Sequence, residues 1–276
     1  MPFVSTLGGR VFARQAGSGD DVLLVGGAGD EVGAWDPHVR ALSERFRVTT
    51  FDPRSVGQST TPIGPYTVGE LTADAVAVLD RFDIERTHVV GASLGGLVAQ
   101  RLAVEHPDRV SSLVLSGTWA RSDRYLRALL RSWTVTAERA RSVDELLAQI
   151  DLWTRSRPTW NVGTIDDEIA HEERTFPGVA FHLVRDGFIA TVAAAFGHDD
   201  SQRLGGVEAP VLVLAGEADL VVPEALARDL AGRFGNATFA TIAGAGHAAH
   251  LDAPERFVAA VEGFWARHPV AGVATA

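Results

Sequence analysis

The stretch that most constrains the fold of this chain is residues 89–96, which reads Val-Val-Gly-Ala-Ser-Leu-Gly-Gly. Its β-branched start predicts a strand, and the apolar pattern that follows predicts a helix. Ser93 then stands at a sharp turn between the two. Gly91 and Gly95 leave room for two backbone segments to approach closely, where a side chain would collide. The stretch therefore indicates a nucleophile elbow, which presents a serine hydroxyl at the end of a buried strand.

Short apolar runs alternate with helix-like segments on both sides of this stretch. The predicted buried strands are 21–25, 47–51, 87–92, 110–116, 210–216 and 238–242. The predicted helices are 36–45, with Asp36 as its cap, and 67–82, 94–105, 223–234 and 254–267. Two alternating runs around Gly8-Gly9 predict an N-terminal hairpin. This order predicts an α/β fold with a mostly parallel, doubly wound sheet covered on both faces.

The alternation breaks after Ser116. Residues 118–197 show no parallel-strand run, and helical patterns dominate at 125–134, 143–154, 166–174 and 177–196. Ligands bind at the carboxyl edge of open parallel sheets, which is the edge that this insertion leaves. We therefore expect a helical lid over Ser93, formed by residues 118–197 and inserted after the sixth strand. Residues 1–117 and 198–276 would form the core domain.

Composition excludes several classes of function. The chain has 276 residues and a formal net charge of −10. Nucleic acids and anionic membranes attract basic proteins, so neither is expected as a partner. No cysteine is present, which excludes disulfides and thiol nucleophiles. Residues 1–20 lack a signal-peptide pattern and no apolar run could span a bilayer, so we expect a cytoplasmic protein. The sequence fits either a monomer or a homodimer.

A serine hydroxyl needs a base to become a good nucleophile, and the base is best a histidine held by a carboxylate. Asp219 follows the predicted strand that ends at Gly216, and His247 follows the strand that ends at Ile242. Each lies just beyond the carboxyl end of its strand, at the same edge as Ser93. The chain order Ser, Asp, His is the order expected for an elbow serine.

With these motifs the chain resembles the α/β-hydrolase superfamily, in its lid-bearing branch of small esterases, lactonases and C–C bond hydrolases. It is similar to 3-oxoadipate enol-lactonases. The likeness covers nearly the whole length. It rests on Gly91-Ala92-Ser93-Leu94-Gly95, Gly216-Glu217-Ala218-Asp219 and Gly244-Ala245-Gly246-His247. The resemblance implies Ser93 as nucleophile, His247 as general base and Asp219 as orienting acid, in a reaction without a cofactor.

Two backbone N–H groups should form the oxyanion hole. One belongs to Leu94 at the start of the helix. The resemblance places the other at Ala28, in the loop where family members often carry His-Gly and this chain has Gly26-Gly27. A second departure from the family pattern is Ser55, which stands where many relatives have glycine. It could alter a turn without touching the chemistry.

Other residues compete for these roles. Glu217 is a rival to Asp219, and His250 could be mistaken for the base, although a packing role at a helix start suits it better. We expect Gly27, Trp119 and Trp153 to bind substrate, since such pockets are mostly apolar. The aromatic residues of the lid can equally be core. The nine histidines show no metal-ligand spacing, so no metal site is expected.

The sequence therefore predicts a cofactor-free serine hydrolase that cleaves a carboxylic ester or lactone of a moderately apolar small molecule. Hydrolysis of a C–C bond in a β-diketone-like or polyketide-derived compound is an alternative, because the same triad serves it. A perhydrolase or haloperoxidase-like activity is another. A receptor that keeps the triad and only senses its ligand is the non-enzymatic alternative.

Overall fold

Eight strands form one sheet in the computed structural model, which describes residues 2–60, 64–161 and 180–268. They are β1 (Phe3–Thr6), β2 (Gly9–Ala16), β3 (Asp20–Val25), β4 (Phe46–Phe51), β5 (Thr87–Ala92), β6 (Val110–Ser116), β7 (Val211–Gly216) and β8 (Ala237–Ile242). The spatial order is β1-β2-β4-β3-β5-β6-β7-β8. The pairs β1–β2 and β2–β4 are antiparallel, and every other pair is parallel. The predicted hairpin and mostly parallel sheet are confirmed.

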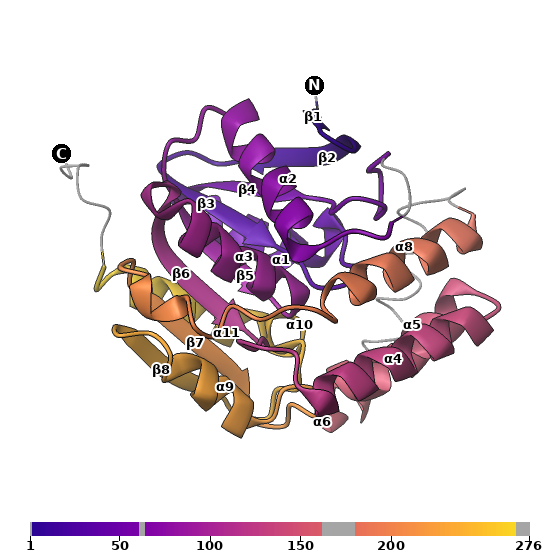
Figure 1. Cartoon of the computed structure of the whole chain (residues 1–276). Coiled ribbons are helices and arrows are strands. Elements are labelled where there is room, and N and C mark those ends of the chain that lie inside the picture. The colour runs from indigo at the N-terminus through magenta and orange to yellow at the C-terminus, as the bar shows by residue number, and fades with distance from the viewer. Residues whose placement is uncertain (1, 61–63, 162–179, 269–276) are drawn as a thin grey trace.

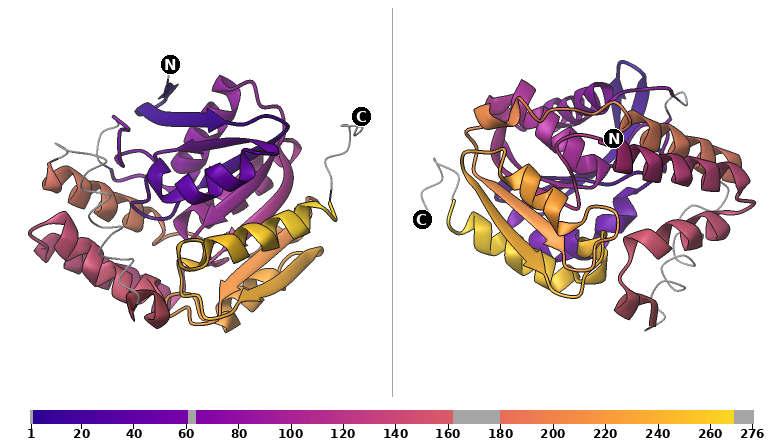
Figure 2. Two further views of the ribbon diagram at one scale, coloured as in Figure 1. Left: turned by 180° about the vertical axis from the view of Figure 1, so that it is seen from behind. Right: turned by 60° about the horizontal axis from the view of Figure 1, so that its bottom comes forward.

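Helices cover both faces of the sheet (Figures 1 and 2). The core helices are α1 (Asp36–Leu42), α2 (Val68–Arg81), α3 (Leu94–Glu105), α9 (Glu224–Ala231), α10 (Ala249–Asp252) and α11 (Pro254–Trp265). Successive side chains of a strand point to opposite faces. Val22 and Leu24 of β3 thus belong to one core cluster with residues of α1 and α11, while Leu23 and Val25 belong to a second one with residues of α2, α3 and α9. This is the doubly wound arrangement that the sequence predicts.

The order of the strands reverses between β3 and β5. After β3 the chain moves outward to β4, and it then returns to β5 on the other side of β3. In open parallel sheets the loops that follow the two strands at such a point diverge and leave a crevice. The loop after β3 carries Gly27 and Ala28, and Ser93 follows β5 directly. The topology therefore brings these two loops to one place.

The segment between β6 and β7, which we call the insertion, contains several helices. Its described helices are α4 (Arg124–Arg139), α5 (Val143–Thr154), α6 (Arg157–Asn161) and α8 (Phe181–Ala194). Of these, α4, α5 and α8 pack against one another beyond one edge of the core (Figure 1). The position after the sixth strand agrees with the prediction. The helix predicted over 166–174 lies outside the described residues, as does the first part of the one predicted over 177–196.

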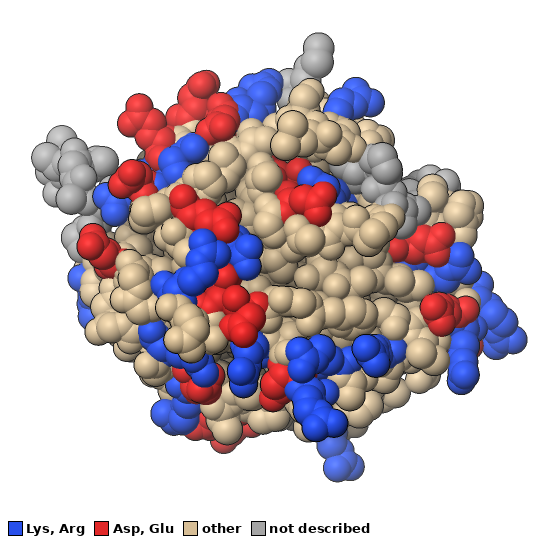
Figure 3. Space-filling model, viewed as in Figure 1, with Lys and Arg blue, Asp and Glu red and all other residues tan. Residues whose placement is uncertain are grey.

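The helix α4 shows why this segment folds as it does. The Asp123 carboxylate accepts a hydrogen bond from the Leu126 N–H at 2.9 Å and so caps the helix. Its apolar residues recur at helical spacing on one face and are buried, namely Leu126, Leu129, Leu130 and Trp133. On the face shown in Figure 3, acidic and basic side chains are interspersed, and blue side chains gather where the insertion lies. Arg124, Arg127 and Arg131 of α4 are exposed.

Several local predictions differ from the structure. The helix α4 continues to Arg139, beyond the predicted end at 134, and α9 ends at Ala231, before the predicted end at 234. Asp36 does not cap α1: the N-cap residue is Trp35, and the Asp36 carboxylate lies in the first turn and pairs with Arg14. The helix ends at Leu42, because residues 43–45 form turns before β4. The short helices α6 and α10 are not predicted, since neither is long enough to show a periodic pattern.

None of the helices within the described ranges has the length and apolar character needed to cross a membrane.

Candidate active site

Ser93 occupies a strained turn between β5 and α3. Its backbone has φ 50° and ψ −116°, a conformation that non-glycine residues rarely adopt, and its N–H donates to the Ser116 carbonyl at 2.9 Å. The glycines are needed for the reason that the sequence suggests. A Cβ on Gly95 would collide with the carbonyl oxygen of Val25, and a Cβ on Gly91 would collide with that of Gly95. The turn therefore holds the Ser93 side chain at the end of the sheet, close to the loop after β3.

The imidazole of His247 connects Ser93 to Asp219. Its Nε2 lies 2.9 Å from the Ser93 Oγ, and its Nδ1 lies 3.0 Å from Oδ2 of Asp219. The other carboxylate oxygen of Asp219 accepts the N–H groups of Val221 and Val222, each at 2.8 Å. This geometry suits the His247 tautomer that donates from Nδ1 to Asp219 and turns Nε2, an acceptor, toward the hydroxyl. The structure thus brings together the three residues that the sequence singles out.

The rival residues have other partners. The Glu217 carboxylate is exposed and accepts the Gly244 N–H at 2.8 Å, in the loop after β8. His250 lies in α10, where its ring stacks on Trp35 with the ring centres 4.6 Å apart. Burial in this apolar cluster lowers the pKa of His250 well below its usual value. Asp219, and not Glu217, is therefore the acid in contact with His247, and His250 has a packing role.

Two backbone N–H groups, one in each of the two loops that meet at Ser93, lack a hydrogen-bond acceptor among the described residues. They belong to Ala28, in the loop after β3, and to Leu94, the first residue of α3. Gly27 brings the loop close, since a Cβ built on it would lie 3.4 Å from the Ser93 Cβ. The first turn of a helix leaves its N–H groups free and carries a partial positive charge. This pair of donors is the one that the sequence predicts for an oxyanion hole.

Asp30 places a carboxylate next to the nucleophile, and sequence reasoning missed it. Its Oδ2 accepts the Gly27 N–H at 2.6 Å. A Cβ built on Gly27 would lie 3.0 Å from this oxygen and 3.4 Å from the Ser93 Cβ. Gly27 therefore lies between the Asp30 carboxylate and Ser93. Burial raises the pKa of Asp30, while the Gly27 hydrogen bond and the neighbouring His247 and Arg155 oppose that rise. An acid in a glycine-rich turn is common, so the sequence carries no signal that would have distinguished it.

The predicted aromatic wall residues lie in different surroundings. Trp119 is buried, and its indole N–H donates to Ser122 Oγ at 2.8 Å. Trp153 on α5 is 43 % exposed. Phe188 on α8 is the insertion side chain that contacts the loop after β3, because a Cβ on Gly29 would lie 3.0 Å from its ring. Phe188 belongs to a helix about 160 positions further along the chain, and no local pattern could indicate that contact.

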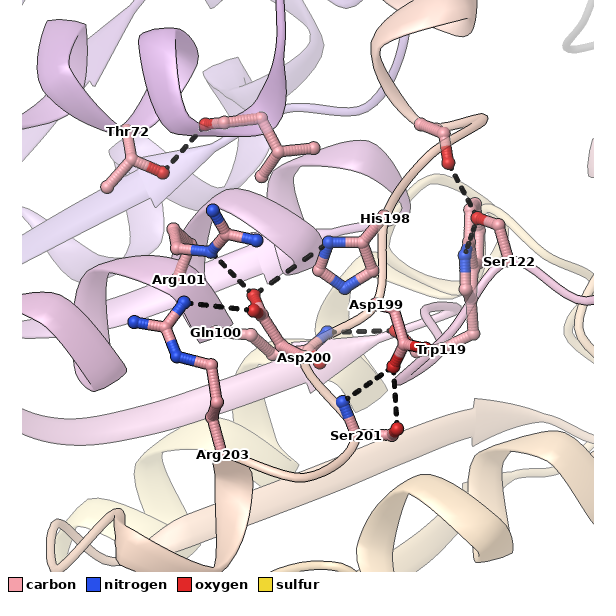
Figure 4. A network of polar contacts seen from close by, with 12 residues as sticks. Thr72, Gln100, Arg101, Trp119, Ser122, His198, Asp199, Asp200, Ser201 and Arg203 are labelled. Carbon is pink, nitrogen blue, oxygen red and sulfur yellow. Dashed lines mark hydrogen bonds and ion pairs between the residues drawn. The ribbon is translucent and has the colours of Figure 1, made fainter.

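The two ends of the insertion are joined by buried polar contacts (Figure 4). Ser122 donates its N–H to the His198 carbonyl at 2.9 Å and its hydroxyl to the Ala195 carbonyl at 2.6 Å. The buried Asp200 carboxylate accepts from Arg101 of α3 at 2.7 Å and from Arg203 at 3.2 Å. Burial lowers the pKa of His198 to about 4. His198 is thus a neutral packing residue where the insertion returns to the core.

Ser55 adopts a conformation that favours glycine. Its φ is 62°, which agrees with the family pattern that places glycine at this position. Gly187 of α8 packs against this turn, where a Cβ would collide with the Ser55 carbonyl oxygen. Nearby, Asp52 accepts the N–H groups of Val32 and Gln58, and burial raises its pKa to about 6. The departure at Ser55 changes no group in contact with Ser93.

The chain is similar to known proteins along most of its length. The family model described as alpha/beta hydrolase fold matches residues 22–254. A protein of Caulobacter vibrioides named as carbamate hydrolase RutD is 31% identical, over 93% of this chain and 92% of its own. A protein of Mycobacterium tuberculosis named as non-heme bromoperoxidase BpoC is 30% identical, over 91% of this chain and 95% of its own.

Among solved structures, the enol-lactonase from Burkholderia xenovorans LB400 superposes with a TM-score of 0.85 at 26% identity. The match covers 96% of this chain and all of that one. The family model spans most of the chain. The chain therefore belongs to the α/β-hydrolase fold family, and this membership supports a hydrolase.

Proposed function

We propose that this protein is a serine hydrolase that cleaves carboxylic esters or lactones through an acyl-enzyme on Ser93. The observation that carries the proposal is the continuous hydrogen-bonded path from the Ser93 hydroxyl through His247 to Asp219, at 2.9 Å and 3.0 Å. A serine hydroxyl becomes a good nucleophile when a base takes its proton as it attacks. The free N–H groups of Ala28 and Leu94 next to that hydroxyl add the second requirement, a place for negative charge.

The reaction proceeds in two halves. Ser93 Oγ attacks the carbonyl carbon while His247 Nε2 takes the hydroxyl proton, and the Asp219 carboxylate stabilises the imidazolium through Nδ1–H. The carbonyl oxygen becomes an oxyanion that the N–H groups of Ala28 and Leu94 hold. Collapse expels the alcohol, which receives its proton from His247 Nε2. Water then attacks the acyl-enzyme carbonyl and gives a proton to His247. As the second tetrahedral intermediate collapses, His247 returns this proton to Ser93 Oγ and the acid is released.

A carbamate is the second candidate substrate class. The relative named as carbamate hydrolase RutD shares 31% identity over most of both chains. Carbamate hydrolysis needs the same attack and the same oxyanion donors, and it differs in that His247 protonates a nitrogen or oxygen leaving group. The ester or lactone stays the first choice, because a nitrogen leaving group is poorer and makes a greater demand on the general acid.

The helical insertion acts as a lid in this proposal, and residues 1–117 with 198–276 act as the core. Phe188 on α8 lies against the loop that carries Ala28, so the insertion covers one side of the proposed oxyanion hole. Gly27 beside Ser93 is a substrate contact in this scheme. Trp119 and Trp153 stay proposals as wall residues.

A fluorophosphonate probe tests the mechanism directly. We expect it to modify the protein at one site, Ser93, as located by peptide mass spectrometry. A panel of p-nitrophenyl esters, lactones, aryl carbamates and β-diketones then assigns the substrate class from kcat/KM. Failure to label Ser93 in folded protein would overturn the serine mechanism. Stoichiometric binding of a substrate without turnover would favour the receptor alternative.

A further inference from the structure

One buried carboxylate, that of Asp252, joins the helical insertion to the loop of His247. Its Oδ1 accepts hydrogen bonds from Arg155 Nε and from the Thr159 hydroxyl, both at 2.9 Å. Its Oδ2 accepts the Ser156 N–H at 2.8 Å and the Gly246 N–H at 2.7 Å. The Asp252 and Arg155 side chains are only 1% and 2% exposed. Three of these donors belong to the insertion and the fourth is the residue before His247.

The insertion also holds the other side of His247. The Ala248 N–H donates to the Thr154 carbonyl at 2.8 Å. Gly246 has no room for a side chain, because a Cβ on it would lie 2.9 Å from that same carbonyl oxygen and 2.8 Å from the Ser156 nitrogen. One backbone N–H on each side of His247, that of Gly246 and that of Ala248, is thus bound to Asp252 or to the end of α5.

We propose that Asp252 is a positioning residue for catalysis: it uses the α5–α6 connection of the insertion to hold the His247 imidazole between Ser93 and Asp219. The inference rests on the proposed serine mechanism for its kinetic consequence, although the geometry is independent of it. The insertion would then be part of the catalytic machinery as well as a cover. Asp252 itself touches no reacting atom.

The physical reason is the number of donors on one carboxylate. Four donors that converge on two ionised oxygens suit a carboxylate and suit an amide poorly, since an amide NH2 would face two of the donors. A neutral residue would also remove the buried ion pair between Asp252 and Arg155, which costs free energy because both side chains are shielded from water. The Gly246 peptide is the most easily displaced member, because it lies in a loop. His247 would move with it.

The test compares Asp252→Asn with Asp74→Asn. Asp74 forms a similar buried ion pair with Arg54, at 2.7 Å and 2.8 Å, but far along the chain from His247. Two readouts are used: the low-field proton NMR signal of His247 Nδ1–H, assigned by its loss in His247→Gln, and kcat and KM of the best substrate. We expect Asp252→Asn to lose the signal and to lower kcat by about 100-fold at nearly unchanged KM, since a small misplacement of a catalytic group has that effect.

Asp74→Asn should keep the signal and a kcat within about threefold of wild type at temperatures where both variants are folded. If Asp252→Asn does not fold, Thr159→Val decides, because it removes one donor at nearly constant volume. We expect it to broaden the signal and to lower kcat several-fold. A sharp, unshifted signal and control-like kcat in the folded variants would overturn the inference. The NMR signal reports the imidazole even if no ester is cleaved, so failure of the proposed function gives a different result.

Discussion

The Oγ of Ser93 lies 2.9 Å from Nε2 of His247, although the two residues are 154 positions apart in the chain. The contact exists because β5 and β8 end at the same edge of a parallel sheet, and because the loop after β8 returns across β7 toward β5. Gly216, at the end of β7, allows this return, since a Cβ there would collide with the Gly246 carbonyl oxygen. Strand order thus brings the Ser93 hydroxyl and the His247 imidazole together.

Replacing Ser93 with alanine should lower kcat by at least about 10⁴-fold and leave the fold intact, because the nucleophile is lost while the β5–α3 turn keeps its backbone contacts. Alanine bears the same strain at φ 50° as serine. Activity is measured with the best ester, and folding by the thermal midpoint and far-UV circular dichroism. Turnover close to wild type would show that the nucleophile lies elsewhere.

Asp219→Asn should lower kcat by about 10⁴-fold, because an amide cannot both accept from His247 Nδ1–H and stabilise an imidazolium. Glu217→Gln should change kcat less than threefold, since its amide oxygen can still accept the Gly244 N–H. Parallel steady-state kinetics of the two variants provide the comparison. A larger loss in Glu217→Gln would transfer the orienting role to Glu217.

Asp30→Asn should reduce the preference for substrates that carry a positive charge near the scissile bond. A carboxylate within several ångströms of a bound cation contributes about 1–2 kcal/mol at an effective dielectric constant near 20, roughly a tenfold preference. The measurement is the ratio of kcat/KM for a choline thioester to that for its uncharged 3,3-dimethylbutyl analogue.

The exposed Asp108 provides the matched control for this experiment, and Asp108→Asn should leave the ratio unchanged. The Gly27 N–H keeps its acceptor in Asp30→Asn, so the loop geometry is preserved. An unchanged ratio in Asp30→Asn would show that the Asp30 carboxyl is neutral in the complex, as its raised pKa allows.

Stability should fall as the pH drops from about 6.5 to 4, because four histidines are buried in the neutral form. Burial lowers the pKa of His38, His88 and His198 to about 4, and that of His250 well below its usual value. The unfolded chain binds these protons near pH 6.5 and the native protein does not, so each group costs up to about 1.4 kcal/mol per pH unit within that window.

His38→Leu should therefore flatten the dependence of unfolding free energy on pH between 6.5 and 4, by about 1 kcal/mol per pH unit. Urea unfolding at a series of pH values provides the measurement, with the exposed His182→Leu as control. The raised pKa of Asp52 opposes the trend below pH 6, so the difference between variants is decisive. Equal slopes in His38→Leu and wild type would contradict the prediction.

Asp83→Gly should raise the thermal midpoint by about 2–4 °C, equivalent to about 1 kcal/mol. Asp83 follows the C-cap residue of α2 and has φ 53°. The Ile84 N–H donates to the Leu79 carbonyl at 2.9 Å, and the Asp83 N–H donates to the Asp80 carbonyl at 3.2 Å. This is a Schellman motif, which favours glycine at the left-handed position. The substitution also removes a negative charge from a helix C-terminus. Asp83→Ala, which keeps the Cβ, should give little or no gain in calorimetry.

Local sequence patterns determined most of the elements. The strands Thr87–Ala92 and Val110–Ser116 and the helices Leu94–Glu105 and Val143–Thr154 begin and end where the sequence predicts. Each is set by apolar periodicity, glycine or capping residues, which act over a few positions. The positions of Ser93, Asp219 and His247 at strand ends follow from the same patterns, because carboxyl ends of parallel strands share one edge.

Only the tertiary structure decided which residues surround these three. Asp30 faces Ser93 across Gly27, Phe188 covers the loop after β3, and Asp252 joins the α5–α6 connection to the His247 loop. These contacts join residues far apart in the sequence, and neither partner carries a local signature of the other. Strands, helix caps and turns depend on residues a few positions apart, so the sequence alone indicates them. The contacts named here join distant residues and exist only after the sheet and the insertion have packed.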